Sequence, residues 1–281
     1  MLNIPTDTPA SKQPNEFRSF ELSGWQHSCT EYRDSFGPLT SQLIGPILDL
    51  LSPKVGSSFL DIATGPGYLA AAAAQRGANV VGVDFSENMI SLARTLAPTA
   101  TFEIGDAEAL RFESQSFDSV SMNFGILHFA RPQLALEEAA RVAVPNGSFA
   151  FSCWNTPDKA LGFQAVLGAI GSHGAKNVSL PDGPPFFFFS NPDNGVAALR
   201  SAGFRDIQVL NVPLMWKFAD ANAFFNAFLD GTARTGGLLR AQPASNLCEI
   251  RVAVIEAVSR DFQGDEGISV PMPALLYSAR R

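Results

Sequence analysis

Asp61-Ile62-Ala63-Thr64-Gly65-Pro66-Gly67 is the stretch that decides the fold of this chain. It follows the short run Ser58-Phe59-Leu60 and precedes the alanine-rich segment 68–74, which strongly favours a helix. Strand, glycine turn and helix in this order form one unit of a parallel α/β sheet. A carboxylate at the strand tip, with two glycines that let a ligand approach the backbone, predicts a site for a nucleotide-like cofactor.

The alternation of strand and helix continues on both sides of this turn. Apolar runs of strand length alternate with helix-length segments whose apolar residues recur every three to four positions. The predicted strands are 58–62, 80–83, 100–104, 117–124, 148–154, 206–212 and 273–281. The predicted helices are 23–36, 39–51, 67–76, 86–97, 132–143, 193–202, 220–230 and 244–262, with Ser86 as an N-cap. This order predicts a parallel sheet with helices on both faces.

Regularity and composition divide the chain into four parts. We expect a flexible N-terminal arm, a cofactor-binding core with an N-terminal cap helix, a substrate-lid insertion that begins after Trp154, and a C-terminal part of the core with further cap helices. The arm is residues 1–20, the cofactor-binding core is 21–155, the lid insertion is 156–192 and the C-terminal part is 193–281.

Composition narrows the classes of partner. The 281 residues carry a formal net charge of -7 and no basic stripe, which disfavours nucleic acid. Cys29, Cys153 and Cys248 are far apart and match no metal or redox spacing, so we expect no metal site. Residues 1–16 lack the layout of a signal peptide, and no apolar run approaches the roughly 20 residues of a membrane span. We therefore expect a cytoplasmic protein without stable membrane insertion.

Two cofactors fit the glycine turn. Gly65-Pro66-Gly67-Tyr68-Leu69-Ala70 matches the G-x-G-x-x-A dinucleotide pattern, and Asp84 follows at the offset of a ribose-binding acid, so NAD is one candidate. Asp61 argues against it, because a carboxylate beside a pyrophosphate costs several kcal/mol. S-adenosylmethionine instead brings a cationic amino group and a sulfonium. Asp106 can accept a hydrogen bond from an adenine amino group, and Asn123 ends the fourth strand where a transferring group should lie.

With these acids at successive strand ends, the chain resembles a class I S-adenosylmethionine-dependent methyltransferase. It is similar to the group of ubiquinone/menaquinone-biosynthesis and natural-product small-molecule methyltransferases. The resemblance spans about residues 55–155 and rests on residues 61–67, 83–86, 105–110, 116–118 and 145–147. It implies a Rossmann-like seven-stranded, mostly parallel sheet with an antiparallel last strand and a helical cap or insertion. It also implies methyl transfer to an O, C or N atom of a small apolar or aromatic metabolite in secondary metabolism, by a monomer or homodimer.

The resemblance also places residues around the cofactor. Asp84 should take the ribose hydroxyls, Asp106 the adenine, and Asp61 the methionine end. The implied cofactor-binding residues are Tyr32, Asp61, Ala63, Gly65, Gly67, Asp84, Phe85, Met89, Asp106, Ala107, Asn123 and Phe124. Plainer interpretations stay open: Asp84 could cap the next helix, Asp106 could be a solvated turn residue, and Phe85 and Phe124 could be core.

His128 is the candidate general base, because it follows strand four by a few residues and histidine titrates near neutrality. A structural histidine that shapes the pocket floor is the alternative. Aromatic residues gather after position 154, which indicates an apolar or aromatic substrate, although core packing also explains them. The candidate substrate-binding residues are His27, Trp154, Phe163, Phe187 and Trp216.

Two further functions remain open at this point. The same fold and cofactor can support non-methylating chemistry such as intramolecular cyclisation. An NAD-dependent reductase would use the same glycine turn.

Overall fold

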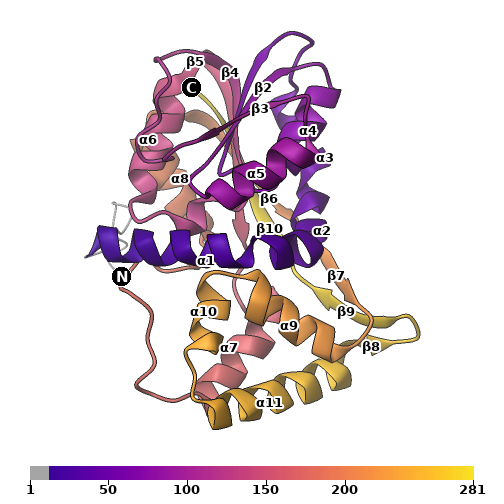
Figure 1. Cartoon of the computed structure of the whole chain (residues 1–281). Coiled ribbons are helices and arrows are strands. Elements are labelled where there is room, and N and C mark those ends of the chain that lie inside the picture. The colour runs from indigo at the N-terminus through magenta and orange to yellow at the C-terminus, as the bar shows by residue number, and fades with distance from the viewer. Residues whose placement is uncertain (1–12) are drawn as a thin grey trace.

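The computed structural model describes residues 13–281, and a seven-stranded sheet lies at its centre (Figure 1). Its strands, in the order β3-β2-β1-β4-β5-β10-β6, are parallel except β10, which is antiparallel to both β5 and β6. The strands are β1 (Ser58–Ile62), β2 (Asn79–Asp84), β3 (Thr101–Ile104), β4 (Phe117–Met122), β5 (Ala143–Trp154), β6 (Arg205–Val212) and β10 (Ala274–Arg280). The predicted fold class, a mostly parallel Rossmann-like sheet with an antiparallel last strand, is confirmed.

Helices cover both faces of this sheet. One face carries α3 (Ile44–Leu51), α4 (Tyr68–Gln75) and α5 (Glu87–Leu96), and the other carries α6 (Pro132–Val142) and α8 (Pro192–Ser201) (Figure 1). The predicted cap of α5 is confirmed, because the Ser86 hydroxyl accepts a hydrogen bond from the Met89 backbone N–H at 3.4 Å.

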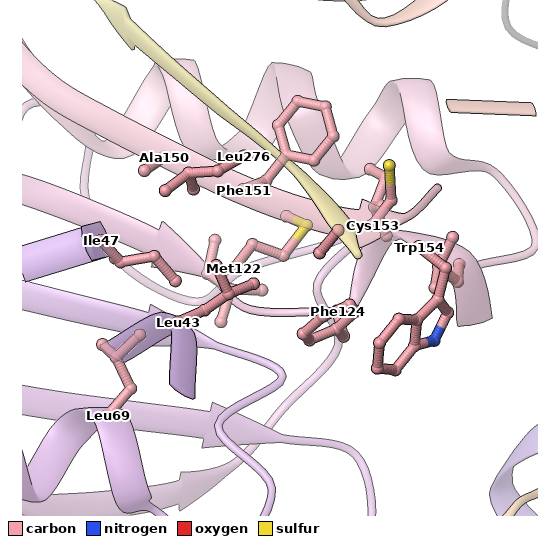
Figure 2. Close-up of a cluster of buried hydrophobic side chains, with 14 of the residues drawn as sticks. Leu43, Ile47, Leu69, Met122, Phe124, Ala150, Phe151, Cys153, Trp154 and Leu276 are labelled. Atoms are coloured by element: carbon pink, nitrogen blue, oxygen red, sulfur yellow. The ribbon is translucent and has the colours of Figure 1, made fainter. Parts of the chain in front are cut away.

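The core lies between the helices and the central strands. Figure 2 shows part of it, where Leu43 and Ile47 approach the sheet from the side of α3. Phe151 of β5 stacks on Tyr277 of β10, with ring centroids 4.4 Å apart. These side chains are fully buried, and each contributes roughly 1.5–3 kcal/mol of hydrophobic stabilisation. The packing holds the carboxyl ends of β4 and β5 in fixed positions.

A cap of helices and a small second sheet lies beyond the carboxyl ends of the strands, and α1 runs between the two layers (Figure 1). The second sheet has the order β7-β9-β8 and was not predicted. Its strands are β7 (Met215–Phe218), β8 (Gln263–Gly264) and β9 (Gly267–Pro271). The helical elements of the cap are α1 (Pro14–Asp34), α2 (Phe36–Thr40), η1 (Ser41–Leu43), α7 (Leu161–His173), α9 (Ala221–Gly231), α10 (Arg234–Arg240) and α11 (Ala244–Phe262), and η3 (Phe188–Ser190) precedes α8. Within residues 13–281, the length and apolar character needed to cross a membrane occur in no helix.

The prediction of a flexible arm through residue 20 is wrong from Pro14 onward. Helix α1 begins there, with proline in its first turn and Glu16 close behind, both of which favour a helix start. Phe17 is fully buried, so tertiary packing anchors this first turn. The earlier part of the predicted arm, residues 1–12, lies outside the described residues.

Two boundaries also differ from expectation. The predicted helix 39–51 is three short elements, α2, η1 and α3. Strand β5 begins at Ala143, before the predicted turn, because the chain passes through an irregularity opposite β4. Asn146 adopts φ +65° there, a left-handed conformation that asparagine tolerates.

Candidate active site

A cavity lies where β1, β2 and β4 end, beneath α1. Most of the residues that the sequence singles out line it, although they come from positions 32 to 163. The predicted site residues in the lining are Tyr32, Asp61, Ala63, Gly65, Asp84, Phe85, Met89, Asp106, Ala107, Asn123, Phe124, His128, Trp154 and Phe163. The fold therefore brings fourteen of the eighteen sequence candidates to one cavity.

Asp61 lies at the tip of β1 and is almost completely buried, with 1% of its surface exposed. Its two carboxylate oxygens accept hydrogen bonds from the hydroxyls of Thr64 and Ser121, both at 2.7 Å. Burial raises the pKa of Asp61 to about 6, and these hydrogen bonds and the others that it accepts only partly oppose that effect. A buried carboxylate with this pKa ionises more readily when a cationic ligand enters.

Asp84 lies at the tip of the neighbouring strand β2. Its oxygens accept hydrogen bonds from the backbone N–H groups of Gly65 and Ser86, each at 2.9 Å. Burial raises the pKa of Asp84 to about 6 as well. Because Ser86 caps α5, Asp84 is not needed as the cap, and it ties the glycine turn to the second strand.

Asp106 follows β3 and forms an ion pair with Arg18 of α1, with 2.5 Å between guanidinium nitrogen and carboxylate oxygen. Its other oxygen accepts a hydrogen bond from the Glu108 backbone N–H at 3.0 Å. Both partners are partly exposed, so the pair contributes little to stability. It links the cap helix to the third acid of the cavity.

Backbone strain also marks this cavity. Ala63 after β1 and Phe124 after β4 adopt φ +53° and +56°, the left-handed region that residues with a side chain rarely occupy. Such residues cost of order 1–3 kcal/mol and gather at functional sites. Here the Phe124 N–H is held by the Ser152 hydroxyl at 2.9 Å, and that hydroxyl donates to the side-chain oxygen of Asn123 at 2.7 Å.

The other end of the cavity is aromatic. Phe124 and Trp154 stack with ring centroids 4.0 Å apart, and both lie at the ends of their strands in Figure 2. The aromatic rings in the lining are Trp25, Tyr32, Phe36, Tyr68, Phe85, Phe124, His128, Phe129, Trp154, Phe163 and Phe186. Flat apolar surfaces of this kind suit an aromatic ligand.

His128 stands on this aromatic side, on the short 3₁₀ helix η2 (Ile126–His128) after β4. Its Nδ1 lies 3.0 Å from a carboxylate oxygen of Glu21, a fully buried residue of α1. The ring of Trp25 packs edge-on against the imidazole at 4.8 Å. Arg234 of α10 lies 3.7 Å from the other Glu21 oxygen.

Residues 60–151 match a family model described as a methyltransferase domain. The chain is 30% identical to a demethylmenaquinone methyltransferase of Paenarthrobacter aurescens over 175 residues, which cover 59% of this chain and 69% of that protein. It is 34% identical to a ubiquinone/menaquinone biosynthesis C-methyltransferase of Geobacter sulfurreducens over 54% of this chain and 66% of the relative. The chain belongs to the S-adenosylmethionine-dependent methyltransferases. Its cofactor is S-adenosylmethionine.

A solved structure agrees with this assignment at the level of the fold. Phosphoethanolamine N-methyltransferase 2 of Haemonchus contortus, in complex with S-adenosylmethionine, superposes with a TM-score of 0.57 at 21% identity. The superposition covers 94% of this chain and 60% of that one.

Four sequence candidates lie outside the cavity lining of the methyltransferase. His27 is exposed on α1, and Phe187 packs against Phe163 with ring centroids 5.4 Å apart. Trp216 is buried in the cap and donates a hydrogen bond to the Ser35 carbonyl at 3.2 Å. Gly67 adopts φ +80° against the ring of Phe102, so the turn needs its backbone freedom and its small size.

The sequence prediction missed Arg18, Glu21, Trp25 and Arg234: three of them line the methyltransferase cavity, and Glu21 contacts His128 and Arg234 behind the lining. The first three share one face of α1 with Tyr32, and their spacing of three, four and seven residues is a helical signal. This spacing was not recognised because residues 1–20 were predicted to be a flexible arm. Arg234 lies in α10, which contains Gly236 and Gly237 and therefore has low intrinsic helix propensity.

Proposed function

We propose that this methyltransferase transfers the methyl group of S-adenosylmethionine to an oxygen or carbon atom of a small aromatic metabolite. The observation that carries the proposal is the composition of the cavity. One end has buried carboxylates at successive strand tips, and the other is lined by aromatic rings.

The residues of the acidic end fit the cofactor by their chemistry. When bound, S-adenosylmethionine supplies a methyl group activated on a cationic sulfur. Buried Asp61, with its raised pKa, complements positive charge at the methionine end, beside Ala63 and Gly65. In this proposal Asp84 accepts hydrogen bonds from the ribose hydroxyls, and Asp106 and Ala107 contact the adenine; all three residues line the cavity. The lining that would complete this end consists of Tyr32, Phe85, Met89, Asn123 and Phe124, and Phe124 is shared with the aromatic end through its stack on Trp154.

The acceptor class rests on the aromatic end and on the relatives. Trp154, Phe163 and Phe186 form a continuous set, with centroids 5.6 and 5.5 Å apart between successive rings. Such a set can enclose a flat ring and exclude water, which helps to align the methyl acceptor. Two relatives are named for methylation in menaquinone or ubiquinone biosynthesis, so a reduced quinone ring is the first acceptor to test.

The cofactor part of the proposal is tested by titration calorimetry. S-adenosylhomocysteine should bind to the wild-type protein, and NAD should not. Binding of NAD without binding of S-adenosylhomocysteine would refute the assignment of the acidic end.

The acceptor part is tested by incubating the protein and S-adenosylmethionine with reduced short-chain demethylmenaquinone, 1-naphthol or 1-aminonaphthalene. Formation of S-adenosylhomocysteine together with an O- or C-methylated product of a hydroxyl-bearing probe is the expected result. Methylthioadenosine as the main product would indicate intramolecular chemistry instead. Cofactor binding without transfer to any of these aromatic probes would refute the aromatic acceptor class.

A further inference from the structure

Glu21 is an unusual residue in the cap. Its carboxylate is fully buried between α1, η2 and α10, and it contacts His128 on one side and Arg234 on the other. Oxygen Oε2 is 3.0 Å from His128 Nδ1, whereas Oε1 has no hydrogen-bond partner among the described residues. A buried acceptor without a partner costs about 1–3 kcal/mol, and a buried ion pair often stabilises less than apolar packing. Stability alone therefore does not explain Glu21.

Arg234 is the cationic partner of Glu21. The guanidinium is mostly buried, with 15% of its side chain exposed, and its Nε is 3.7 Å from Glu21 Oε1. Its NH1 group donates hydrogen bonds to the carbonyls of Leu127 and Pro184 at 3.2 and 3.0 Å. The rings of Phe17 and Phe186 lie on it at 5.1 and 5.2 Å. An arginine fixed in this way remains a cation and is the ion-pair partner of the Glu21 carboxylate.

An ionised Glu21 determines which nitrogen of His128 carries the proton. A carboxylate can only accept hydrogen bonds, so the Nδ1 atom that faces it must be the donor. A neutral imidazole with a proton on Nδ1 has a free lone pair on Nε2. Trp25 packs edge-on against the imidazole, and Phe186 lies 6.0 Å away, which limits rotation of the ring.

We infer that Glu21, held by Arg234, is a positioning residue that keeps His128 in the tautomer whose Nε2 accepts a proton from a hydroxyl group of the acceptor. The inference rests on the proposed function and makes its acceptor more specific. The proton of the hydroxyl passes to Nε2, and the electron pair that it leaves drives bond formation to the methyl carbon from the oxygen or from a ring carbon conjugated with it. In the second case the ring carbon then loses its hydrogen as a proton to solvent, which restores the aromatic ring. The electron pair of the broken carbon–sulfur bond stays on the sulfur. A neutral amine needs no such base, so the arrangement accelerates transfer to hydroxyl-bearing aromatic acceptors and gives no such advantage to amines.

The tautomer is measured directly by 15N NMR of the imidazole nitrogens, because protonated and unprotonated ring nitrogens resonate far apart. The chain has three histidines, and the signals that disappear in His128→Asn identify those of His128. In the wild-type protein with S-adenosylhomocysteine we expect a protonated Nδ1 and an unprotonated Nε2. In Glu21→Gln we expect both tautomers, because the amide can donate to Nδ1 as well as accept from it.

Glu31→Gln is the matched control, because Glu31 is on the same helix but exposed. It should leave the spectrum of His128 as in the wild type. If Glu21→Gln does not fold, Glu21→Asp keeps the charge on a shorter side chain and Arg234→Gln removes the cation; a tautomer mixture is expected only in the second. A wild-type His128 with its proton on Nε2, or a tautomer that is the same in all variants, would overturn the inference.

The functional consequence is measured with the matched probes 1-naphthol and 1-aminonaphthalene. Glu21→Gln should lower kcat for the hydroxyl acceptor by roughly 100-fold, the scale of a misdirected general base, with a nearly unchanged KM for S-adenosylmethionine. Transfer to the amine but not to the hydroxyl, or an unchanged kcat, would overturn the role given to Nε2.

Different results would refute the proposed function and the positioning role of Glu21. Absence of cofactor binding would refute the proposed function and leave the NMR result for the tautomer standing. A His128 that carries its proton on Nε2, together with normal methyl transfer, would refute the role of Glu21 and leave the proposed function intact.

Discussion

The acidic end of the cavity is built from segments close together in the chain, whereas the aromatic end is assembled from the whole length of the protein. The acids at the tips of β1, β2 and β3 fall within residues 61–106 and lie on adjacent strands. The aromatic end draws on α1, η2, α7 and the loop before η3, and a cation from α10 completes it. Neighbouring strand tips follow from topology, but cap contacts follow only from tertiary packing.

The two ends are also held by different forces. Backbone conformation and N–H groups fix the acidic end, as the bonds from Gly65 and Ser86 to Asp84 show. Side-chain packing and one buried charge cluster around Glu21 fix the aromatic end. Substitutions at the acidic end should therefore change the free energy of unfolding or the affinity for the cofactor. Substitutions at the aromatic end should change the rate of transfer to the acceptor.

Gly67→Ala should give the largest effect, because this position is constrained by both backbone and packing. A Cβ at φ +80° would lie 2.8 Å from the Phe102 ring and 3.1 Å from the Cβ of Ala93. The Phe102 ring cannot retreat easily, since it also lies against Gly82. Left-handed strain and overpacking together predict a loss of about 3 kcal/mol in the free energy of unfolding, measured by urea denaturation.

Gly65→Ala is the control for that measurement. Gly65 adopts φ +53°, but within residues 13–281 no atom outside its two chain neighbours lies within 4 Å of an added Cβ. The free energy of unfolding of Gly65→Ala should fall by only about 1 kcal/mol, because backbone strain is its only cost. Equal losses in the two variants would show that packing against Phe102 does not constrain the turn.

His128→Ala tests the aromatic end. If the imidazole accepts the proton of the acceptor, kcat should fall by roughly 100-fold or more while the affinity for S-adenosylhomocysteine, measured by calorimetry, stays near the wild-type value. A fall of less than about tenfold would favour the alternative in which His128 only shapes the cavity floor. A comparable loss of cofactor affinity would contradict the assignment of the acidic end to the cofactor and the aromatic end to the acceptor.

The contrast explains what could be predicted from the sequence. Asp61, Asp84 and Asp106 were found because each ends an apolar run, and parallel strands place such ends side by side. Glu21 was missed because its role depends on α10, more than 200 residues away in the chain, and on a helix whose first turns are held by packing of Phe17. Trp216 and Phe187 lie outside the cavity lining, since aromatic composition alone does not separate core from cavity.

Asp84→Ala tests the acidic end at a single residue. Removing a buried acceptor should weaken S-adenosylhomocysteine binding by roughly 1–3 kcal/mol, or about 5- to 150-fold in Kd, because hydroxyl partners lose their hydrogen bonds. Asp118→Ala is the control, since that exposed carboxylate binds Ser58 at the opposite end of the sheet. Unchanged affinity in Asp84→Ala would remove this residue from the cofactor site.

The smallest expected effect is a pH dependence confined to the acidic end. Burial raises the pKa of both Asp61 and Asp84 to about 6, so the free protein takes up protons on these carboxyls as the pH falls from 7.5 to 5. The cationic amino group of S-adenosylhomocysteine favours the ionised carboxylates, so the complex holds fewer protons than the free protein. By linkage, affinity for S-adenosylhomocysteine should rise with pH through about 6, by roughly tenfold in total, and level off above 7.

Calorimetry across this range separates the two carboxyls from the rest of the molecule. Asp84→Asn should bind more weakly at pH 7.5 but show a shallower pH dependence, because one of the two titrating groups is gone. Asp118→Asn should follow the wild-type curve, since hydrogen bonds from Ser58 hold the pKa of Asp118 below its usual value. An affinity that falls as the pH rises through 6 would have the wrong sign for a cation bound beside buried carboxylates, and would separate the acidic end from cofactor binding.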